Sequence, residues 1–398
     1  MSSNQSSPAV GARGATLPDD ESALLVGRLF DPSQNGPCVV TVRGDRLADI
    51  TRFAPTTSEL FERDDLVEFV SSVEPTTTWS LDEVLTSTFQ RDSSLPHLLA
   101  PIDLQVIKAA GVTFARSLLE RVIEERSKGD PAGAVEVRNK VIAAIDGTVS
   151  GVRPGSVEAE AVKQVLIKEG LWSQYLEVGI GPDPEIFTKA PVLSAVGTGA
   201  QIGILERSTW NNPEPEVVLV ITRSGHVVGA TLGNDVNLRD FEGRSALLLP
   251  EAKDNNASCA IGPFVRVFGP GFRLETVRDL EVEMTVMGVD GYKLHDTSSM
   301  REISRDIGSL VAHAYGRHHR YPDGFVLFTG TMFAPTQDRD EPGLGFTHHR
   351  GDVVRISSPL IGTLSNEVNT AEDAPDWDFG IRRLFQNLAE RGLLRCVR

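Results

Sequence analysis

The chain has 398 residues, of which 40% are hydrophobic and 24% are charged, and its formal net charge is −16. This length is too great for one ordinary hydrophobic core and predicts a globular protein of two or three domains. The negative charge argues against nucleic acid or an anionic membrane as the main partner, but a bound metal ion could still attract an anionic small substrate.

The cysteines and the N-terminus bear on location. Cys38, Cys259 and Cys396 are scattered, odd in number and without metal-ligand spacing, which predicts a reduced, cytoplasmic protein. No apolar run approaches the roughly 20 residues of a membrane-spanning helix. The first 22 residues lack an apolar signal segment, so residues 1–22 are predicted to form a flexible tail.

Short strands and turns dominate the next part of the chain. Residues 23–50 alternate β-forming runs with turn sequences such as Asp31-Pro-Ser-Gln-Asn-Gly. A short helix is predicted at 57–61, and the polar stretch 73–94 has the composition of a connection. We therefore predict a small N-terminal α+β domain over residues 23–95, interpreted as a docking or oligomerisation module without chemistry of its own.

The remaining residues, 96–398, are predicted to form the catalytic domain. Apolar residues recur at helical spacing in five segments, namely 113–125, 133–146, 156–169 (with Ser156 as N-cap), 300–315 and 379–392. Strands and loops begin near residue 176, and strands dominate 217–288 and 325–368. Because strands and helices do not alternate regularly as in a doubly wound sheet, the sequence predicts a β-rich α+β fold.

A β-hairpin is predicted within residues 211–253, where two runs rich in Val, Leu, Ile and Thr flank Arg-Ser-Gly. If Ser224-Gly225 form a two-residue loop, paired residue numbers sum to 449. This register sets Glu214 opposite Asp235, and it sets Glu216 opposite a glycine, Gly233, whose lack of a side chain leaves room. Residues two apart on a strand share a face, so the two glutamates project together.

The carboxylates on this hairpin predict a metal site. Directly opposed Cβ atoms lie about 4.5–5.5 Å apart, and like charges at that distance repel. Glu214, Glu216 and Asp235 would therefore destabilise the hairpin unless a positive charge lay among them. A hard divalent cation is the simplest candidate, because Mg²⁺ and Ca²⁺ take oxygen ligands, and Mn²⁺ accepts them too.

Several segments have the order and spacing of a known superfamily. They are Glu214-Pro-Glu216, Asp235 eighteen residues before Lys253, Thr329-Gly330-Thr331, Gly351-Asp352-Val353 and Gly362-Thr-Leu-Ser-Asn366. From about Leu98 to Val368 the chain resembles the fumarylacetoacetate hydrolase superfamily, and within it the 2-keto-3-deoxy-sugar-acid dehydratases. The resemblance implies a mixed β-roll catalytic domain, Mg²⁺ held by the three carboxylates, a 2-oxo acid substrate and a homodimer or homotetramer.

The same resemblance implies roles for further residues. Lys253 and Glu185 match catalytic positions, and Thr331 with Gly330 matches the segment that touches the substrate carboxylate or keto group. Two alternatives remain open at this point: Lys253 could be a solvated loop lysine, and Glu185 could cap a helix or pair with Lys189.

The helix predicted at 113–125 departs from the superfamily's hydrolases. They carry a His and Glu pair that activates water, whereas here Ser117 stands in the place of the His and Glu120 is kept. This departure lowers the expectation of a hydrolase. Ser117 is a candidate substrate contact or a structural residue, and Arg116 could reach the substrate carboxylate or pair with Glu120 at i,i+4 spacing.

Three aromatic or histidine features are expected to be structural. The pairs His318-His319 and His348-His349 are predicted to flank exposed turns, because adjacent side chains point apart. Trp210, just before the acidic pair, is predicted to belong to the core.

The implied function is a metal-dependent hydro-lyase acting on 2-keto-3-deoxy-xylonate or -arabinonate and giving 2,5-dioxopentanoate. A base would remove the C3 proton, which the ketone acidifies, and an acid would protonate the departing C4 hydroxyl. Lys253 needs a lowered pKa to serve as the base, and the roles of Lys253 and Glu185 stay interchangeable. The alternatives are a C–C bond hydrolase of the acylpyruvate or fumarylacetoacetate type, and a catalytically silent metal-binding homologue.

Overall fold

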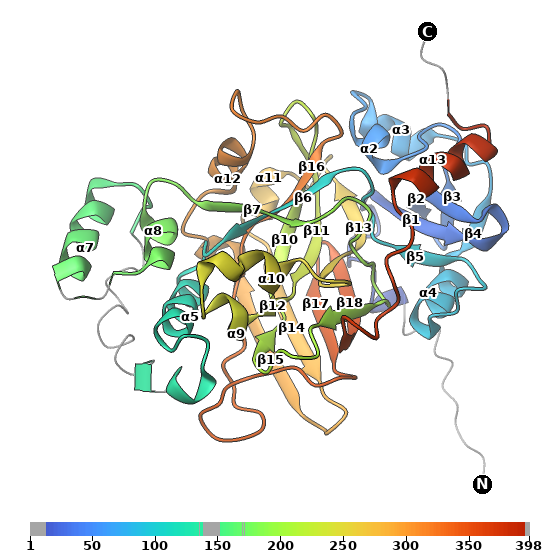
Figure 1. Cartoon of the computed structure of the whole chain (residues 1–398). Helices are drawn as coiled ribbons and strands as arrows, with labels where there is room; N and C mark the ends of the chain where they lie inside the picture. Colours follow the sequence, from blue (N-terminus) through green and yellow to red (C-terminus); the bar gives the residue numbers. More distant parts are fainter. Residues whose placement is uncertain (1–12, 135, 138–151, 169, 171, 395–398) are drawn as a thin grey trace.

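The computed structural model describes residues 13–134, 136–137, 152–168, 170 and 172–394. Among these residues, one sheet has eleven strands and a second has five. Figure 1 shows the strands at the centre, with α5 (Ala115–Arg126), α7 (Val157–Lys168) and α8 (Gln174–Ile180) on one side. The N-terminal elements lie on the other side together with the C-terminal helix α13 (Ile381–Glu390).

The strands of the larger sheet, in spatial order, are β4 (Thr78–Ser80), β3 (Arg46–Asp49), β2 (Gly36–Arg43), β1 (Leu25–Asp31), β13 (Cys259–Val267), β11 (Val227–Asp235), β10 (Pro215–Ile221), β16 (Phe325–Phe328), β6 (Val106–Gly111) and β7 (Glu185–Ala190), with β5 (His97–Leu99) paired to β1. The smaller sheet follows the order β15 (Lys293–Ser299), β14 (Glu281–Met287), β17 (Val353–Ser358), β18 (Gly362–Thr370) and β8 (Gln201–Ile204). A short pair joins β12 (Asn237–Leu238) to β9 (Asn211–Asn212).

The other helices are α2 (Thr57–Phe61), α3 (Leu66–Ser72), α4 (Leu81–Gln90), α9 (Arg239–Glu242), α10 (Leu249–Lys253), α11 (Leu274–Val277) and α12 (Ile307–Ala314), with 3-10 turns η1 (Pro32–Gln34), η2 (Ala246–Leu248) and η3 (Met300–Glu302). None of the helices in the described ranges is long and apolar enough to cross a membrane.

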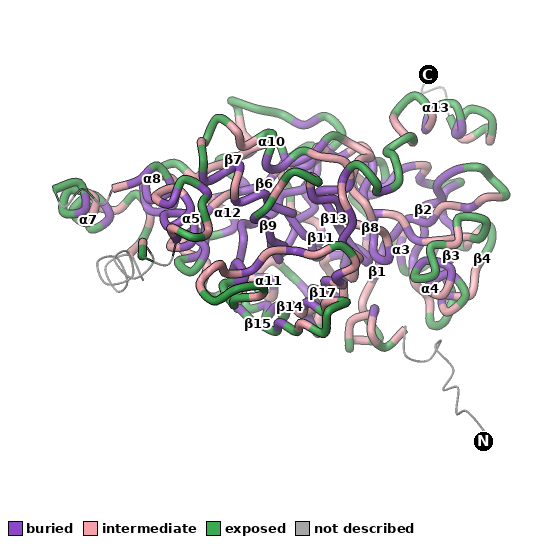
Figure 2. The backbone as a smooth tube through the Cα atoms, turned by 60° about the horizontal axis from the view of Figure 1, so that its bottom comes forward, coloured by how far each residue is buried: buried purple, intermediate pink, exposed green. Residues whose placement is uncertain are grey.

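The largest hydrophobic core lies between the two sheets. Strand β10 is buried along its whole length: Val217, Leu219 and Ile221 pack toward the smaller sheet, and Val218 and Val220 face a second core. Figure 2 shows this central region as buried, in contrast to α7 and α13, which are largely exposed. Two sheets packed through alternating side chains, with helices outside them, confirm the predicted β-rich α+β fold.

The predicted N-terminal domain continues the larger sheet. Strand β1 pairs with β13 through Leu25↔Arg266 and Val26↔Val265, and β5 returns to pair with β1. The C-terminal helix also packs there, since Asn387 Nδ2 donates to Gln34 O at 2.8 Å. Residues 13–22 of the predicted tail lie against the smaller sheet, where Thr363 N donates to the carbonyl of the buried Thr16 at 3.0 Å.

The predicted helices agree with the structure in part. Helices α5, α7 and α13 fall in predicted segments, and Ser156 Oγ accepts from Ala159 N at 3.1 Å as the predicted cap does. The segment predicted at 300–315 is instead split into η3 and α12, because Asp306 caps a new helix through Gly308 N. Helix α8 was not predicted, and most of the helix predicted at 133–146 lies outside the described residues.

The register predicted for the hairpin is confirmed, but its loop is different. Pro215↔Asn234 and Glu216↔Gly233 pair as expected, and Asp235 N donates to Glu214 O at 3.0 Å. The loop has three residues, because Thr222 N donates to His226 O at 2.9 Å. A bulge between β10 and β11 then adds one residue and restores the predicted pairing toward the acidic end.

Replacing Gly233 with valine is expected to destabilise the protein by about 1–3 kcal/mol through overpacking. A Cβ at Gly233 would lie 2.6 Å from Val218 and would overlap Phe328, so the strand has no room for a side chain. The urea midpoint of Gly233→Val should fall clearly below that of Gly14→Ala, a control with no atom within 4 Å of the added Cβ. Equal midpoints would contradict this account of the packing.

Candidate active site

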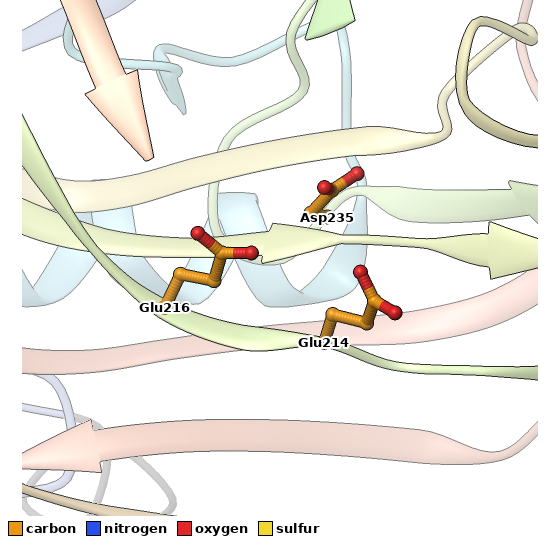
Figure 3. A group of neighbouring side chains, drawn as sticks. All are labelled: Glu214, Glu216 and Asp235. Carbon is orange, nitrogen blue, oxygen red and sulfur yellow. The ribbon is translucent and has the colours of Figure 1, made fainter. Parts of the chain in front are cut away.

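Three carboxylates meet at the end of the β10–β11 hairpin. Glu214 precedes β10, Glu216 lies on it, and Asp235 ends β11; each is buried, with at most 1% of its surface exposed. One oxygen from each lies within 4.8 Å of the others. Figure 3 shows the three side chains converging from two neighbouring strands, so the predicted triad forms.

Lys253 lies between two of these carboxylates. Its Nζ is 2.5 Å from Glu214 Oε2 and 3.1 Å from Asp235 Oδ2, and the residue is buried at the end of α10. Burial acts to lower the pKa of Lys253, but the charges of Asp235, Glu214 and Glu242 outweigh it and raise the pKa above its usual value. Lys253 is therefore a buried ammonium in this cluster and not a solvated loop lysine.

Lys189 is a cluster member that sequence reasoning had considered only as a partner of Glu185. The side chain is fully buried on β7; its Nζ lies 2.9 Å from Asp235 Oδ1 and 3.2 Å from Val236 O, and it also donates to Lys253 O. The two carbonyl oxygens accept hydrogen bonds from this ammonium, and Asp235 Oδ1 is its ion-pair partner. Lys189 thus fixes the candidate ligand Asp235 and the backbone that carries Lys253. The sequence could have indicated this position, because Lys189 follows Glu185 by four residues on one strand. Residues an even number apart on a strand share a face.

Helix α5 adds a second charged group that sequence reasoning missed. Arg121 contacts Glu214, lies 2.7 Å from Glu124 Oε2 and lies 2.9 Å from Glu242 Oε2. Burial opposes the charge of Arg121, but these carboxylates raise its pKa well above the ordinary value. Arg121 therefore links the triad to α9.

A second arginine, Arg239 on α9, completes this group. Its Nε lies 2.5 Å from Glu124 Oε1 and its Nη2 lies 3.1 Å from Glu120 Oε2. Its guanidinium carbon lies 4.7 Å from the ring centroid of Trp210, which is buried as predicted. Burial acts to raise the pKa of Glu124, but Arg121 and Arg239 lower it overall.

The buried charges of this cluster do not balance. Among the described residues it contains six buried carboxylates and four buried cationic side chains: Glu120, Glu124, Glu214, Glu216, Asp235 and Glu242 against Arg121, Lys189, Arg239 and Lys253. Full ionisation would leave two uncompensated negative charges in a low-dielectric interior, which is strongly unfavourable. One divalent cation among the triad oxygens would restore neutrality, so the donor set fits such an ion.

Glu216 is held by the Thr329–Thr331 segment. Gly330 N donates to Glu216 Oε2 at 2.7 Å, and Thr331 Oγ1 lies 3.3 Å from Glu216 Oε1. Gly330 has φ +104°, and a Cβ there would overlap Thr113, so only glycine fits. The structure therefore brings Gly330 and Thr331 to the triad.

Glu185 approaches the cluster from β7, opposite Gly111. A Cβ on Gly111 would overlap the Glu185 carboxylate, so that glycine makes room for it. Burial raises the pKa of Glu185, although Arg121 and Lys253 act in the opposite direction. Glu185 also lines a cavity of about 90 Å³ together with Glu242 and Tyr175.

Arg116 does not join the cluster. Its Nη2 lies 2.7 Å from Asp296 Oδ2, with half of its side chain exposed, so it pairs neither with Glu120 nor with the triad.

Ser117 lies on the buried face of α5, but its hydroxyl donates to Phe114 O at 2.9 Å within the first helical turn. Its hydroxyl is thus engaged with the backbone of its own helix.

The expectation that both histidines of the 348–349 pair flank an exposed turn is wrong for His348. His348 is buried, and its Nδ1 lies 3.3 Å from Asp352 Oδ2, which Arg339 also contacts at 2.6 Å. His349 remains partly exposed beside Asp340. The buried arginine and aspartate therefore hold the segment that follows Thr331 inside the fold.

Replacing Arg121 with methionine should destabilise the protein by about 3–5 kcal/mol, because it leaves buried carboxylates without their shared cation. The matched control is Arg116→Met, which breaks an exposed ion pair on the same helix and should cost about 0–1 kcal/mol. Urea unfolding of both variants without added metal measures the difference. Similar losses for the two variants would contradict the structural role of the buried network.

Comparisons with known proteins identify the family of the chain. A sequence model of the fumarylacetoacetate (FAA) hydrolase C-terminal domain matches residues 171–369. A Haloferax volcanii protein, named a probable 2-keto-3-deoxyxylonate dehydratase, is 38% identical over 197 residues, which cover 49% of this chain and 64% of that protein. A Saccharolobus solfataricus 2-dehydro-3-deoxy-D-arabinonate dehydratase is 30% identical over 188 residues, 46% of this chain and 58% of that protein. The matches thus span less than two thirds of either relative.

Solved structures share the fold over a longer range. A 2-keto-3-deoxyarabinonate dehydratase in a hexagonal crystal form has a TM-score of 0.61 and 20% identity, covering 87% of this chain and 99% of its own. A 2-keto-3-deoxy-D-arabinonate dehydratase complexed with magnesium and 2,5-dioxopentanoate has a TM-score of 0.59 and 19% identity with the same coverage. At these identities the likeness shows the fold alone. The family's sequence model covers half of the chain and overlaps the predicted resemblance from residue 171 onward. The chain therefore belongs to the fumarylacetoacetate hydrolase family.

Proposed function

We propose that this protein is a divalent-cation-dependent dehydratase of 2-keto-3-deoxy-pentonates, such as the xylonate or arabinonate, giving 2,5-dioxopentanoate. The observation that carries the proposal is the buried triad Glu214, Glu216 and Asp235 with Lys253 bonded to two of its members. Two relatives at 38% and 30% identity are named as dehydratases of such acids, and one structural neighbour holds magnesium and 2,5-dioxopentanoate. Mg²⁺ is the proposed ion, with Mn²⁺ as a substitute.

The triad, Thr331 and Gly330 are proposed to bind the cation and the carboxylate and keto end of the substrate. A cation held by the triad supplies Lewis-acid stabilisation for the negative charge that develops on the keto oxygen. Thr331 and Gly330 form the wall beside Glu216, where they would position the carboxylate and keto end of the substrate. Because the triad is buried, a cation held there would act in a surrounding of low dielectric constant, where charges interact more strongly than in water.

Lys253 and Glu185 are the proposed proton-transfer pair. One takes the C3 proton, and the other delivers a proton to the C4 hydroxyl, which leaves as water. The C3–C4 double bond then forms, and transfer of a proton from C5 to C3, followed by ketonisation, gives the C5 aldehyde. The lowered pKa that Lys253 would need as the base is not found, because the charges of Asp235 and Glu214 outweigh its burial and raise the pKa. This favours Lys253 as the proton donor, and it favours Glu185, whose pKa burial raises, as the base.

Removal of divalent cations should abolish dehydration, and Mg²⁺ should restore it. Asp235→Asn should weaken Mg²⁺ binding at least tenfold in calorimetry, because it removes one of three carboxylate ligands. The control Glu281→Gln changes an exposed carboxylate of the smaller sheet and should bind Mg²⁺ like the parent. Full turnover in EDTA by metal-free protein would refute the metal requirement.

Lys253→Met and Glu185→Gln should each lower kcat for the pentonates by about 10²–10⁴, the usual range for losing an acid or base. Lys293→Met, which changes an exposed lysine on β15, is the control and should keep the parent's kcat. Product is measured as 2,5-dioxopentanoate from each C4 epimer. Unchanged kcat in Lys253→Met would refute the assignment.

The alternative function is C–C bond hydrolysis of an acylpyruvate-type substrate. The structure gives this alternative less support, because the hydroxyl of Ser117, at the position of the hydrolases' histidine, bonds the helix backbone. Cleavage of acylpyruvates with no dehydration of any pentonate would establish the hydrolase instead.

A further inference from the structure

Two buried asparagines extend the acidic end of the β10–β11 hairpin by one pair of residues. Asn212 on β9 pairs with Asn237 on β12. Two residues along each strand, Asp235 N donates to Glu214 O at 3.0 Å, so the register of the acidic pair continues into the amide pair. The two asparagines are therefore the next side-chain pair along the hairpin from two candidate metal ligands.

The amide pair lies on the same face of the hairpin as the carboxylates. Side chains along a strand alternate between faces, and directly paired residues share a face. Val236 and Leu238, which flank Asn237, belong to the core between the two sheets. Asn237 therefore faces away from that core, on the side of Asp235, and its partner Asn212 faces the same way.

Three amide atoms of this pair lack hydrogen-bond partners. Within the described part of the chain, no group bonds Asn237 Oδ1, Asn237 Nδ2 or Asn212 Oδ1, whereas Asn212 Nδ2 donates to Pro213 O at 2.8 Å. Both residues are fully buried, as the triad is, so bulk solvent does not reach them. Because buried polar atoms without partners are unfavourable, these atoms indicate a polar group that binds inside the site.

Water held by a divalent cation has the properties of such a group. Mg²⁺ gives up its water reluctantly and usually keeps several water ligands beside its carboxylates. Two residues of strand rise by about 6.7 Å. A bond of about 2.1 Å from the ion to a water and a hydrogen bond of about 2.8 Å together span nearly 5 Å. An amide one pair beyond the ligands is thus suited to contact a water ligand and not the ion itself.

We infer that the Asn212–Asn237 pair accepts hydrogen bonds from water bound to the divalent cation, and that Asn237 is a positioning residue for this hydrated ion. The inference rests on the proposed cation site and adds neutral residues to it. A carboxylate at either position would add negative charge to a cluster in which carboxylates already outnumber cations. An amide oxygen accepts the same hydrogen bond without that charge.

Asn237→Leu removes the unpartnered amide atoms and nearly keeps the shape of the side chain. It should weaken Mg²⁺ binding in calorimetry about 10–100-fold, the usual effect of losing a group that orients a metal's ligands. In EDTA its urea midpoint should equal or exceed that of the parent, because no hydrogen bond within the protein is lost. A purely structural asparagine would give the reverse, a lower midpoint with unchanged affinity.

Asn211→Leu is the matched control from the same strand. Asn211 is also buried, but its Oδ1 accepts from His348 N at 3.2 Å and its Nδ2 donates to Ser208 Oγ at 3.2 Å. This substitution should therefore lower the urea midpoint and change the Mg²⁺ affinity of the folded protein less than twofold.

Mn²⁺-loaded protein separates contact with a water ligand from direct ligation by the amide. In water enriched in the magnetic isotope of oxygen, broadening of the Mn²⁺ electron paramagnetic resonance spectrum counts the coordinated waters. The parent and Asn237→Leu should give the same count. One additional water in the variant would show that Asn237 is itself a ligand and would overturn the inference.

The inference is also overturned if Asn237→Leu binds Mg²⁺ like the parent, or if its midpoint in EDTA falls below that of the parent. Either result leaves the proposed function intact. A parent protein that binds Mg²⁺ but dehydrates no pentonate refutes the proposed function and leaves the inference standing, and a parent that binds no Mg²⁺ refutes both.

Discussion

The repulsion among carboxylates at the end of one hairpin is the constraint that organises this fold. Two adjacent strands place Glu214, Glu216 and Asp235 within 4.8 Å of one another, away from water. Such an arrangement persists only if cations surround it. Four elements supply them: β7 brings Lys189, α10 brings Lys253, α5 brings Arg121 and α9 brings Arg239.

Each of these cations also has a structural effect beyond its charge. Lys189 ties the strand that carries Glu185 to the backbone of Lys253, so the two proposed catalytic residues are mechanically connected. Arg121 joins Glu214 to Glu242, and thereby connects the triad to α9. The candidate metal ligands Glu214 and Asp235 and the proposed catalytic Lys253 thus belong to one buried network of ion pairs.

The sequence predicted those parts of the site that depend on local pairing. The triad follows from the hairpin register. The predicted register is correct although the predicted loop is one residue too short, because the bulge offsets the additional loop residue. Gly233 was identified from the hairpin register and Gly330 from the family resemblance, and both are positions where a side chain would collide. The irregular order of strands and helices likewise predicted the β-rich α+β class.

The parts that could not be predicted depend on contacts between distant segments. Arg121 meets Glu214 from 93 residues away, and β6 pairs in parallel with β16, which follows it by more than 200 residues. The sequence of an amphipathic helix does not show which distant residue a charged side chain will contact. Arg121 and Arg116 therefore cannot be distinguished from the sequence. One is buried among carboxylates, and the other forms an exposed pair with Asp296. Helix α8 has only seven residues, too few for a helical period to emerge.

The imbalance of buried charge connects folding with the proposed function. The four cations stabilise the cluster only in part, since six carboxylates surround them. A divalent cation that binds the folded protein, and not the unfolded chain, stabilises the fold in proportion to its affinity. A neutral interior of well-packed apolar residues would be at least as stable without any ion. The excess of buried carboxylates over cations is therefore better explained as a cation-binding site than as a device for stability.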